Sequence, residues 1–191
     1  MHMETVGLVG WLHTLACTSA LILGAWNMLV FDRGRWHRLR GHIYAGSMVA
    51  ANGLVFAIYR FDMDFRGPPG ANVFGFFHWL AVGALVFTLL GWFASLRQRH
   101  AVWNYVHPVA MLLGYYVLLG GLANELLARI DALRPLAVTV VDGQARFGSP
   151  LVGQTQGALM LATLVLIVLF TVRVTLRRSN RRRPASAPAA A

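Results

Sequence analysis

The spacing of the charged residues constrains this chain more than any other feature. Five long stretches carry no charged side chain, and they run from Thr5 to Phe31, Gly41 to Tyr59, Gly67 to Leu96, His100 to Asn124 and Phe147 to Val172. Because about 20 residues in helical rise cross a hydrocarbon core of about 30 Å, each stretch is long enough to span a bilayer. The sequence therefore predicts an integral membrane protein with five transmembrane segments.

Composition and backbone chemistry predict that these segments are helices. The 191 residues are 57% hydrophobic and 13% charged, whereas soluble domains are roughly 45–50% apolar. Lipid offers the backbone no hydrogen-bond partner, so a spanning segment must be a helix or part of a closed barrel. A barrel would show alternating segments of about ten residues, which are not seen here. We expect an all-α bundle.

The distribution of the basic residues predicts the orientation. All 17 are arginine, and 12 of them follow the first, third and fifth stretches, within Arg33 to Arg40, Arg97 to Arg99 and Arg173 to Arg183. The positive-inside rule then places the N-terminus outside and the C-terminus in the cytoplasm of a cell inner (plasma) membrane. The formal net charge of +10 thus indicates contact with anionic lipid headgroups rather than with nucleic acid.

The first stretch is expected to be a membrane anchor. A cleaved signal peptide needs a basic segment before its apolar region, but Glu4 precedes this stretch and no Lys or Arg occurs before Arg33. The single cysteine, Cys17, lies within the stretch and has no second thiol to pair with.

Loop lengths and turn signals divide the chain into four parts. Short connections predict that the first four helices form an up-down core, with the fifth helix outside it. Turn signals occur at Gly67-Pro68-Pro69-Gly70 and, after a run of valines, at Asp142-Gly143, which predicts a small hairpin. The expected parts are a four-helix core (1–125), an extracellular loop with the hairpin (126–150), the fifth helix (151–176) and a basic, then Pro/Ala-rich disordered tail (177–191).

Two histidines are expected at one depth near the outer side. His13 lies 19 residues before Asp32 and His78 lies 19 residues before Arg97, which places both about 28 Å from the cytoplasmic boundary. The first and third helices are diagonal partners in an up-down bundle, so the imidazoles could face one another. That arrangement suits the two axial ligands of a b-type haem, and His13 and His78 are the favoured ligands.

Small residues accompany both histidines. The shared faces are His13, Cys17, Ala20 and Gly24 on the first helix and Gly75, His78 and Val82 on the third. Such faces would leave room for a flat macrocycle, but small residues at helical spacing also serve close helix packing in lipid.

Four further histidines, His37, His42, His100 and His107, are expected on the cytoplasmic side. His42 and His100 are expected at similar depths, whereas His107 is expected roughly 9 Å deeper in the bundle. Depth alone therefore favours His42 with His100 but does not select a single pair of ligands. All four remain candidate haem ligands. The alternative is that histidines near an interface bond water, headgroups or a carbonyl.

Three short motifs resemble a known family. His37-Arg38-Leu39-Arg40-Gly41-His42-Ile43-Tyr44 resembles the H-R-x-x-G-x-I-Y element of a family of small bacterial membrane proteins that carries a domain of unknown function. Phe77 to Ala81 and His100 to Trp103 continue the likeness over roughly residues 8 to 125. The resemblance implies a multi-helix membrane fold without an assigned activity, and its motif histidines fall on His37, His78 and His100.

A shorter motif, His107-Pro108-Val109-Ala110-Met111, resembles the H-P-x-x-M helix opening of ascorbate-type transmembrane cytochromes b. That likeness implies paired haem ligands supplied by alternating helices. In this sequence only His13 and His78, the pair near the outer side, are expected at the same depth, whereas the histidines on the cytoplasmic side are not matched in this way.

The sequence thus predicts a membrane protein that binds b-type haem and moves electrons, with no indication of its redox partner. The alternative is a non-catalytic accessory subunit or a small-solute permease with structural histidines. No phosphate loop, nucleophile elbow or metalloprotease motif occurs. The five stretches hold no Asp or Glu, which disfavours an ion-coupled carrier.

Overall fold

The computed structural model describes residues 7–30, 34–58, 76–97, 100–141 and 144–182. Its elements are α1 (Leu8–Leu29), α2 (Arg35–Ile58), α3 (Phe76–Leu96), α4 (Trp103–Arg129), α5 (Arg134–Ala137), β1 (Val138–Val141), β2 (Gln144–Phe147) and α6 (Pro150–Arg182). The Gly67–Gly70 and Asp142-Gly143 turn signals and the Pro/Ala-rich tail lie outside the described residues.

Five of these helices, α1, α2, α3, α4 and α6, are long and apolar enough to cross a membrane. Their positions confirm the prediction of an all-helical chain with five candidate spans. Uncharged, mostly apolar stretches form helices here because all backbone N–H and C=O groups except those of the first and last turns are then paired within their own segment.

Two helix ends lie beyond the boundaries expected from charge. The candidate span within α4 runs from Trp103 to Leu127 and includes Glu125, so the expectation that the spans hold no acidic residue is wrong. Helix α6 continues to Arg182, six residues past the expected end at 176. Charge does not stop either helix, because Glu and Arg are good helix formers and a long side chain near a helix end can reach the interface.

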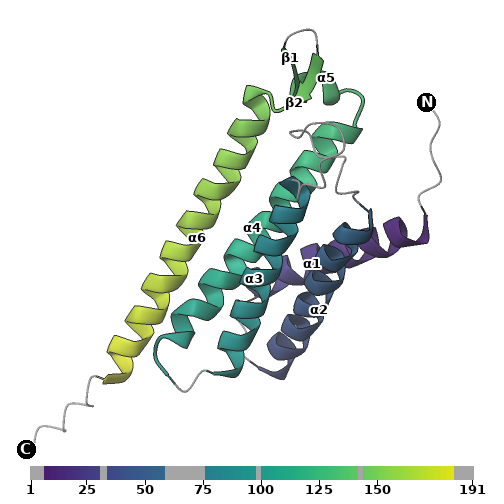
Figure 1. Ribbon diagram of the computed structural model, residues 1–191. Helices are drawn as coiled ribbons and strands as arrows, with labels where there is room; N and C mark the ends of the chain where they lie inside the picture. Colours follow the sequence, from purple (N-terminus) through teal and green to yellow (C-terminus); the bar gives the residue numbers. More distant parts are fainter. Residues whose placement is uncertain (1–6, 31–33, 59–75, 98–99, 142–143, 183–191) are drawn as a thin grey trace, which may run out of the picture.

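The first four helices pack in sequence order. Contacts join α1 to α2, α2 to α3 and α3 to α4, and smaller contacts join α1 to α4, so α1 and α3 are diagonal partners and so are α2 and α4. Helix α6 lies along α4, away from α1 and α2 (Figure 1). We refer below to the hairpin end of the bundle, where α1 and α3 begin, and to the arginine end, where α2 begins at Arg35 and α3 is followed by Arg97.

Side chains from all four of these helices fill the middle of the bundle. The core cluster consists of Ala20, Tyr44, Met48 and Ala84, with Leu23, Met111, Tyr115, Val117 and Leu118 packed against it. Gly24 admits this packing, because a Cβ there would lie 2.5 Å from the Tyr115 ring. The expectation that the small face of α1 leaves room for a macrocycle therefore fails at Gly24, where Tyr115 occupies the space.

Glycines and amides hold α4 against its other neighbours. A Cβ on Gly114 would lie 3.1 Å from Thr88 Oγ1, and one on Gly91 would lie 3.0 Å from Met111 Cγ, so α3 and α4 approach closely. On the opposite side, Gln156 of α6 donates from Nε2 to the Gly120 carbonyl at 3.1 Å and to Asn124 Oδ1 at 3.0 Å.

A short strand pair precedes α6. β1 and β2 pair antiparallel, with Val138 opposite Phe147 and Val141 opposite Gln144, in the segment where the sequence predicts a hairpin. Gly148 follows with φ of 137°, a left-handed conformation that favours glycine. Its N–H and that of Ser149 both donate to the Ala137 carbonyl, which closes the loop before α6.

Candidate functional site

The structure distributes the six candidate histidines over both ends of the bundle. His13 on α1 and His78 on α3 lie near the starts of their helices, at the hairpin end. His37 and His42 on α2 and His107 on α4 lie at the arginine end, where His100 precedes α4. Each end therefore receives histidines from a diagonal pair of helices.

His37 and His107 come together at the arginine end. Their ring centroids are 6.5 Å apart and the ring planes are nearly perpendicular, at 80°. The two rings come from the diagonal helices α2 and α4 and both side chains are half-buried. Depth along the sequence does not identify this pair, because it gives the height of a residue and not its direction around the helix.

A backbone hydrogen bond fixes the ring of His107. Its Nδ1 lies 2.8 Å from the Gly91 carbonyl oxygen, which can only accept, so Nδ1 carries the hydrogen. In a neutral imidazole the other nitrogen, Nε2, then has the free lone pair. A carbonyl that accepts from one imidazole nitrogen and orients the other is the usual outer-shell arrangement of a metal-bound histidine.

His42 has the opposite tautomer. Trp92 Nε1, which can only donate, lies 2.9 Å from His42 Nδ1. His42 Nδ1 therefore accepts, and Nε2 of the neutral ring carries the hydrogen. With no lone pair on Nε2, this form of His42 is a hydrogen-bond donor rather than a metal ligand at that atom.

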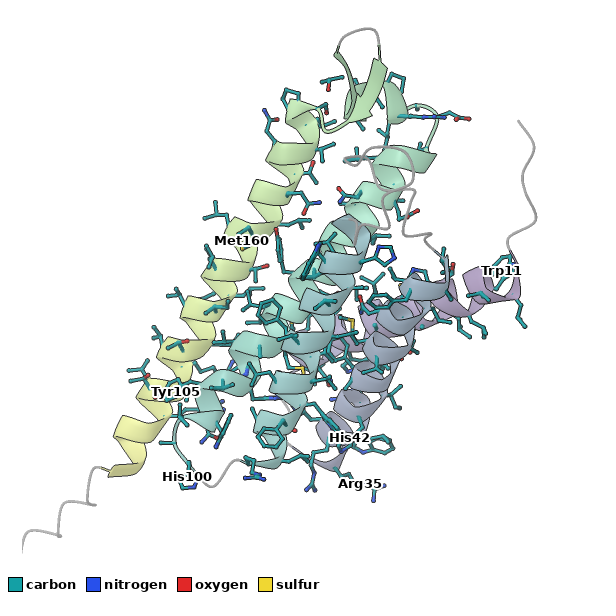
Figure 2. The ribbon with its side chains drawn as sticks, viewed as in Figure 1. Trp11, Arg35, His42, His100, Tyr105 and Met160 are labelled. Carbon is teal, nitrogen blue, oxygen red and sulfur yellow. The ribbon has the colours of Figure 1, made fainter. Side chains whose placement is uncertain are left out.

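His42 and His100 are both exposed. Figure 2 shows them at the same end of the bundle but well apart from each other. The pairing of His42 with His100 that depth favoured therefore does not correspond to two facing side chains.

At the hairpin end, His13 is bonded on both sides of its ring. Nδ1 donates to the Ala51 carbonyl of α2 at 2.9 Å, which leaves the lone pair on Nε2. Cys17 Sγ lies 3.5 Å from that Nε2 and is the donor to it. His13 thus presents the same tautomer as His107, with its lone pair engaged by a weak thiol donor.

His78 is fully buried, with 0% of its surface exposed. Its ring lies against Phe56 of α2, with 5.5 Å between centroids. His13 and His78 thus meet α2 at Ala51 and Phe56, five residues apart, which corresponds to about 7 Å of helical rise. They belong to diagonal helices, as expected, and contact α2 at different levels.

Several neighbours of these histidines were not identified from the sequence. They are Gly91, Trp92 and Ala51. A Trp in a predicted interface is a weak signal, and backbone carbonyls give none. Within the described ranges, no group of three or more His, Cys, Asp or Glu side chains is arranged to hold a metal ion.

Comparison with known proteins adds no assignment: no family model, no curated protein and no solved structure matches this chain. The two resemblances carried by the histidine motifs remain expectations.

Proposed function

We propose that this protein is a multi-pass membrane haem protein in which His37 and His107 are axial ligands of a b-type haem at the arginine end, and that it transfers electrons. The observation that carries the proposal is the ring contact between these two histidines, from diagonal helices, at 6.5 Å and 80°.

The separation of the rings suits axial ligation. Two bonds of about 2 Å from nitrogen to metal, with about 1 Å from each nitrogen to its ring centre, put the centroids of two axial imidazoles about 6 Å apart. His37 and His107 are at 6.5 Å. Axial imidazoles can take any angle about the common axis, so nearly perpendicular planes are compatible with this role.

The tautomer of His107 supports the same role. Its Nδ1–H is held by the Gly91 carbonyl, so Nε2 is the basic nitrogen and ring rotation is restrained before a ligand binds. Such a preset ligand loses less conformational freedom on coordination. When bound, haem would supply a one-electron redox centre, and the protein would supply its ligands, orientation and exclusion of water.

His13 and His78 are proposed as a second pair at the hairpin end. A fully buried histidine inside a membrane segment costs free energy and is by default a functional candidate, and His78 is such a residue. His37 precedes Ala51, the contact of His13, by 14 residues of α2, or about 21 Å. Two centres at these levels would carry electrons most of the way across the bilayer.

The proposal includes the membrane arrangement expected from the sequence. The five candidate spans form a bundle in the cell inner membrane with α1 to α4 as its core, the N-terminus outside and the C-terminus inside. Arg40 supports the placement of the arginine end at a headgroup layer: its guanidinium lies 5.5 Å from the Trp26 ring centroid and its Nε donates to Asn27 Oδ1. Aromatic and basic residues gather in this way at anionic interfaces.

A second candidate function follows from the same hydrogen bonds. His13 and His107 each donate to a carbonyl of a neighbouring helix, and this alone would hold α1 to α2 and α4 to α3. A non-catalytic accessory subunit or a small-solute permease would need nothing more of its histidines. Glu125 within the fourth candidate span supplies the acidic residue that a permease often uses.

The absorption spectrum of the detergent-purified protein separates these two functions. Haem is supplied during expression, and the oxidised and reduced spectra are recorded for the parent protein, His37→Ala, His107→Ala and the control His100→Ala. The proposal predicts a low-spin spectrum in the parent and the control, and in His37→Ala and His107→Ala the loss of the part of that spectrum that belongs to the arginine end. No haem absorption in the folded parent, or a low-spin spectrum unchanged in both variants, would support structural histidines instead.

A further inference from the structure

Two hydroxyl groups are buried in the middle of the bundle. They belong to Tyr44 of α2, which is 4% exposed, and to Thr88 of α3, which is 0% exposed. Neither hydroxyl has a hydrogen-bond partner in the part of the chain that the structure describes. A hydroxyl that is sealed from solvent without a partner costs free energy, and buried hydroxyls of native proteins are paired with protein groups or with ordered water.

Thr88 does not use the acceptor that its own helix offers. Helical threonines can donate to the carbonyl four residues earlier, and five threonines of this chain do so: Thr14, Thr18, Thr155, Thr163 and Thr175. The corresponding carbonyl for Thr88 is that of Ala84, and this bond is not made. Thr88 Oγ1 instead lies next to α4, 3.1 Å from the position of a Cβ on Gly114. The hydroxyl is therefore directed into the core.

Tyr44 differs in a similar way from Tyr115. The centroids of the two rings are 6.4 Å apart, and Tyr115 donates to the Leu21 carbonyl of α1. Tyr44 also lies against α1, with Cε2 3.0 Å from the position of a Cβ on Gly24. Packing thus holds the Tyr44 ring between α1 and α4, while its hydroxyl keeps one hydrogen to donate and lone pairs to accept.

The antiparallel register of α2 and α3 places the two hydroxyl-bearing residues in one layer of the bundle. Two contacts set this register, His42 with Trp92 and Phe56 with His78, and the two contacts are 14 residues apart on both helices. Thr88 therefore lies opposite Gly46, two residues or about 3 Å from the level of Tyr44. On α4 the same layer corresponds to Gly114 and Tyr115, the neighbours of Thr88 and Tyr44.

We propose that the hydroxyls of Tyr44 and Thr88 bind internal water in this layer. The surroundings select water as the occupant, because the two side chains are closed to solvent and the core residues beside them, Met48 and Ala84, are apolar. An ion would lose its hydration shell there at a large cost. Buried waters, in contrast, typically make about three hydrogen bonds to polar groups that have no other partner.

The site lies midway between the two levels of histidines. Tyr44 follows His37 by seven residues and precedes Ala51, the α2 contact of His13, by seven residues, which is about 10 Å in each direction. Water there would place an exchangeable proton in the apolar interval between the histidines. The inference is independent of the proposed haem, because neither pair of histidines takes part in it.

Radiolytic labelling tests the site in the full-length protein in detergent. X-rays generate hydroxyl radicals from bound as well as bulk water, and these radicals oxidise the side chains beside them. Met48 is the reporter, because it packs in one cluster with Tyr44 and is 0% exposed. We expect dose-dependent oxidation of Met48 in the parent, measured by mass spectrometry. In Tyr44→Phe and Thr88→Val the rate should fall to about half or less, since the water loses one of its roughly three hydrogen bonds.

Thr163→Val is the matched control, because Thr163 is also buried but donates to the Leu159 carbonyl of its own helix. It should leave Met48 oxidation at the rate of the parent. Absence of Met48 oxidation in the folded parent, or equal rates in the parent, Tyr44→Phe and Thr88→Val, would overturn the site.

Two further measurements do not depend on the rate in a single variant. Replacing a hydroxyl that has no partner by an apolar group stabilises a core, so a higher unfolding midpoint in both Tyr44→Phe and Thr88→Val would overturn the proposal. An unchanged or lower midpoint supports it. Labelling is also compared between protein expressed with and without added haem, and equal Met48 oxidation is expected. Oxidation that disappears when haem binds would indicate a haem carboxylate at the hydroxyls and would overturn water as the occupant.

Discussion

Tyr115 of α4 donates its hydroxyl hydrogen to the Leu21 carbonyl of α1 at 3.0 Å. The ring reaches that carbonyl across Gly24, where any Cβ would lie 2.5 Å from Tyr115 Cε2. Tyr115 thus links α1 to α4, the pair of neighbouring core helices that contact each other least. Its side chain occupies the space between the histidines of the hairpin end and those of the arginine end.

Gly24→Ala should therefore destabilise the bundle. The added methyl group forces the Tyr115 ring away from α1, and overpacking of this kind costs about 1–3 kcal/mol. We expect a lower unfolding midpoint in detergent, measured by thermal melting. Gly46→Ala is the matched control, because a Cβ at Gly46 would meet nothing within 4 Å. Equal unfolding midpoints for the two variants would show that the packing of the Tyr115 ring against α1 does not require a glycine at position 24.

Gln156→Leu tests the attachment of α6 to α4. The substitution removes the donor to Gly120 and Asn124. A side-chain hydrogen bond between membrane helices contributes about 1 kcal/mol. We expect a lower midpoint and faster proteolysis in the loop before α6. Gln154→Leu, at an exposed position of the same helix, should leave both measurements unchanged. A larger effect at Gln154 would contradict the assigned contact.

The orientation is tested with reporter fusions that are active on one side of the membrane only. Fusions after Gly34 and after Ala191 should both report the cytoplasm, because the positive-inside rule predicts that side for the segments that hold 12 of the 17 arginines. A fusion in the β1–β2 segment should report the outside. Opposite locations for the first two fusions would overturn the topology.

The sequence predicts the five long helices well, because the spacing of the charged residues gives the length of each uncharged stretch directly. It misplaces two ends, at Glu125 and Arg182, since a charge near the interface does not end a helix. It fails to select His37 with His107, because the pairing depends on helix rotation, and on a carbonyl at Gly91 that no side-chain pattern reveals. The small face at Gly24 illustrates the same limit: spacing identifies a close approach but not the side chain, Tyr115, that makes it.

His78→Ala addresses the hairpin end separately. If His13 and His78 hold a second haem, the variant should keep the low-spin spectrum of the arginine end and lose about half of the bound haem, measured as haem per protein against the parent. His100→Ala is the control, because it changes an exposed histidine at the other end of the bundle. Unchanged haem content in His78→Ala would indicate that this buried histidine has a packing role and holds no haem.

Chemical rescue at His107 tests the central claim most directly. His107→Gly removes one proposed axial ligand and leaves a space that free imidazole can enter. The account predicts that purified His107→Gly loses the part of the low-spin haem spectrum that belongs to the arginine end and that added imidazole restores it, while His100→Gly keeps the full spectrum without imidazole. A low-spin spectrum in His107→Gly that neither weakens nor responds to imidazole would contradict ligation by His107.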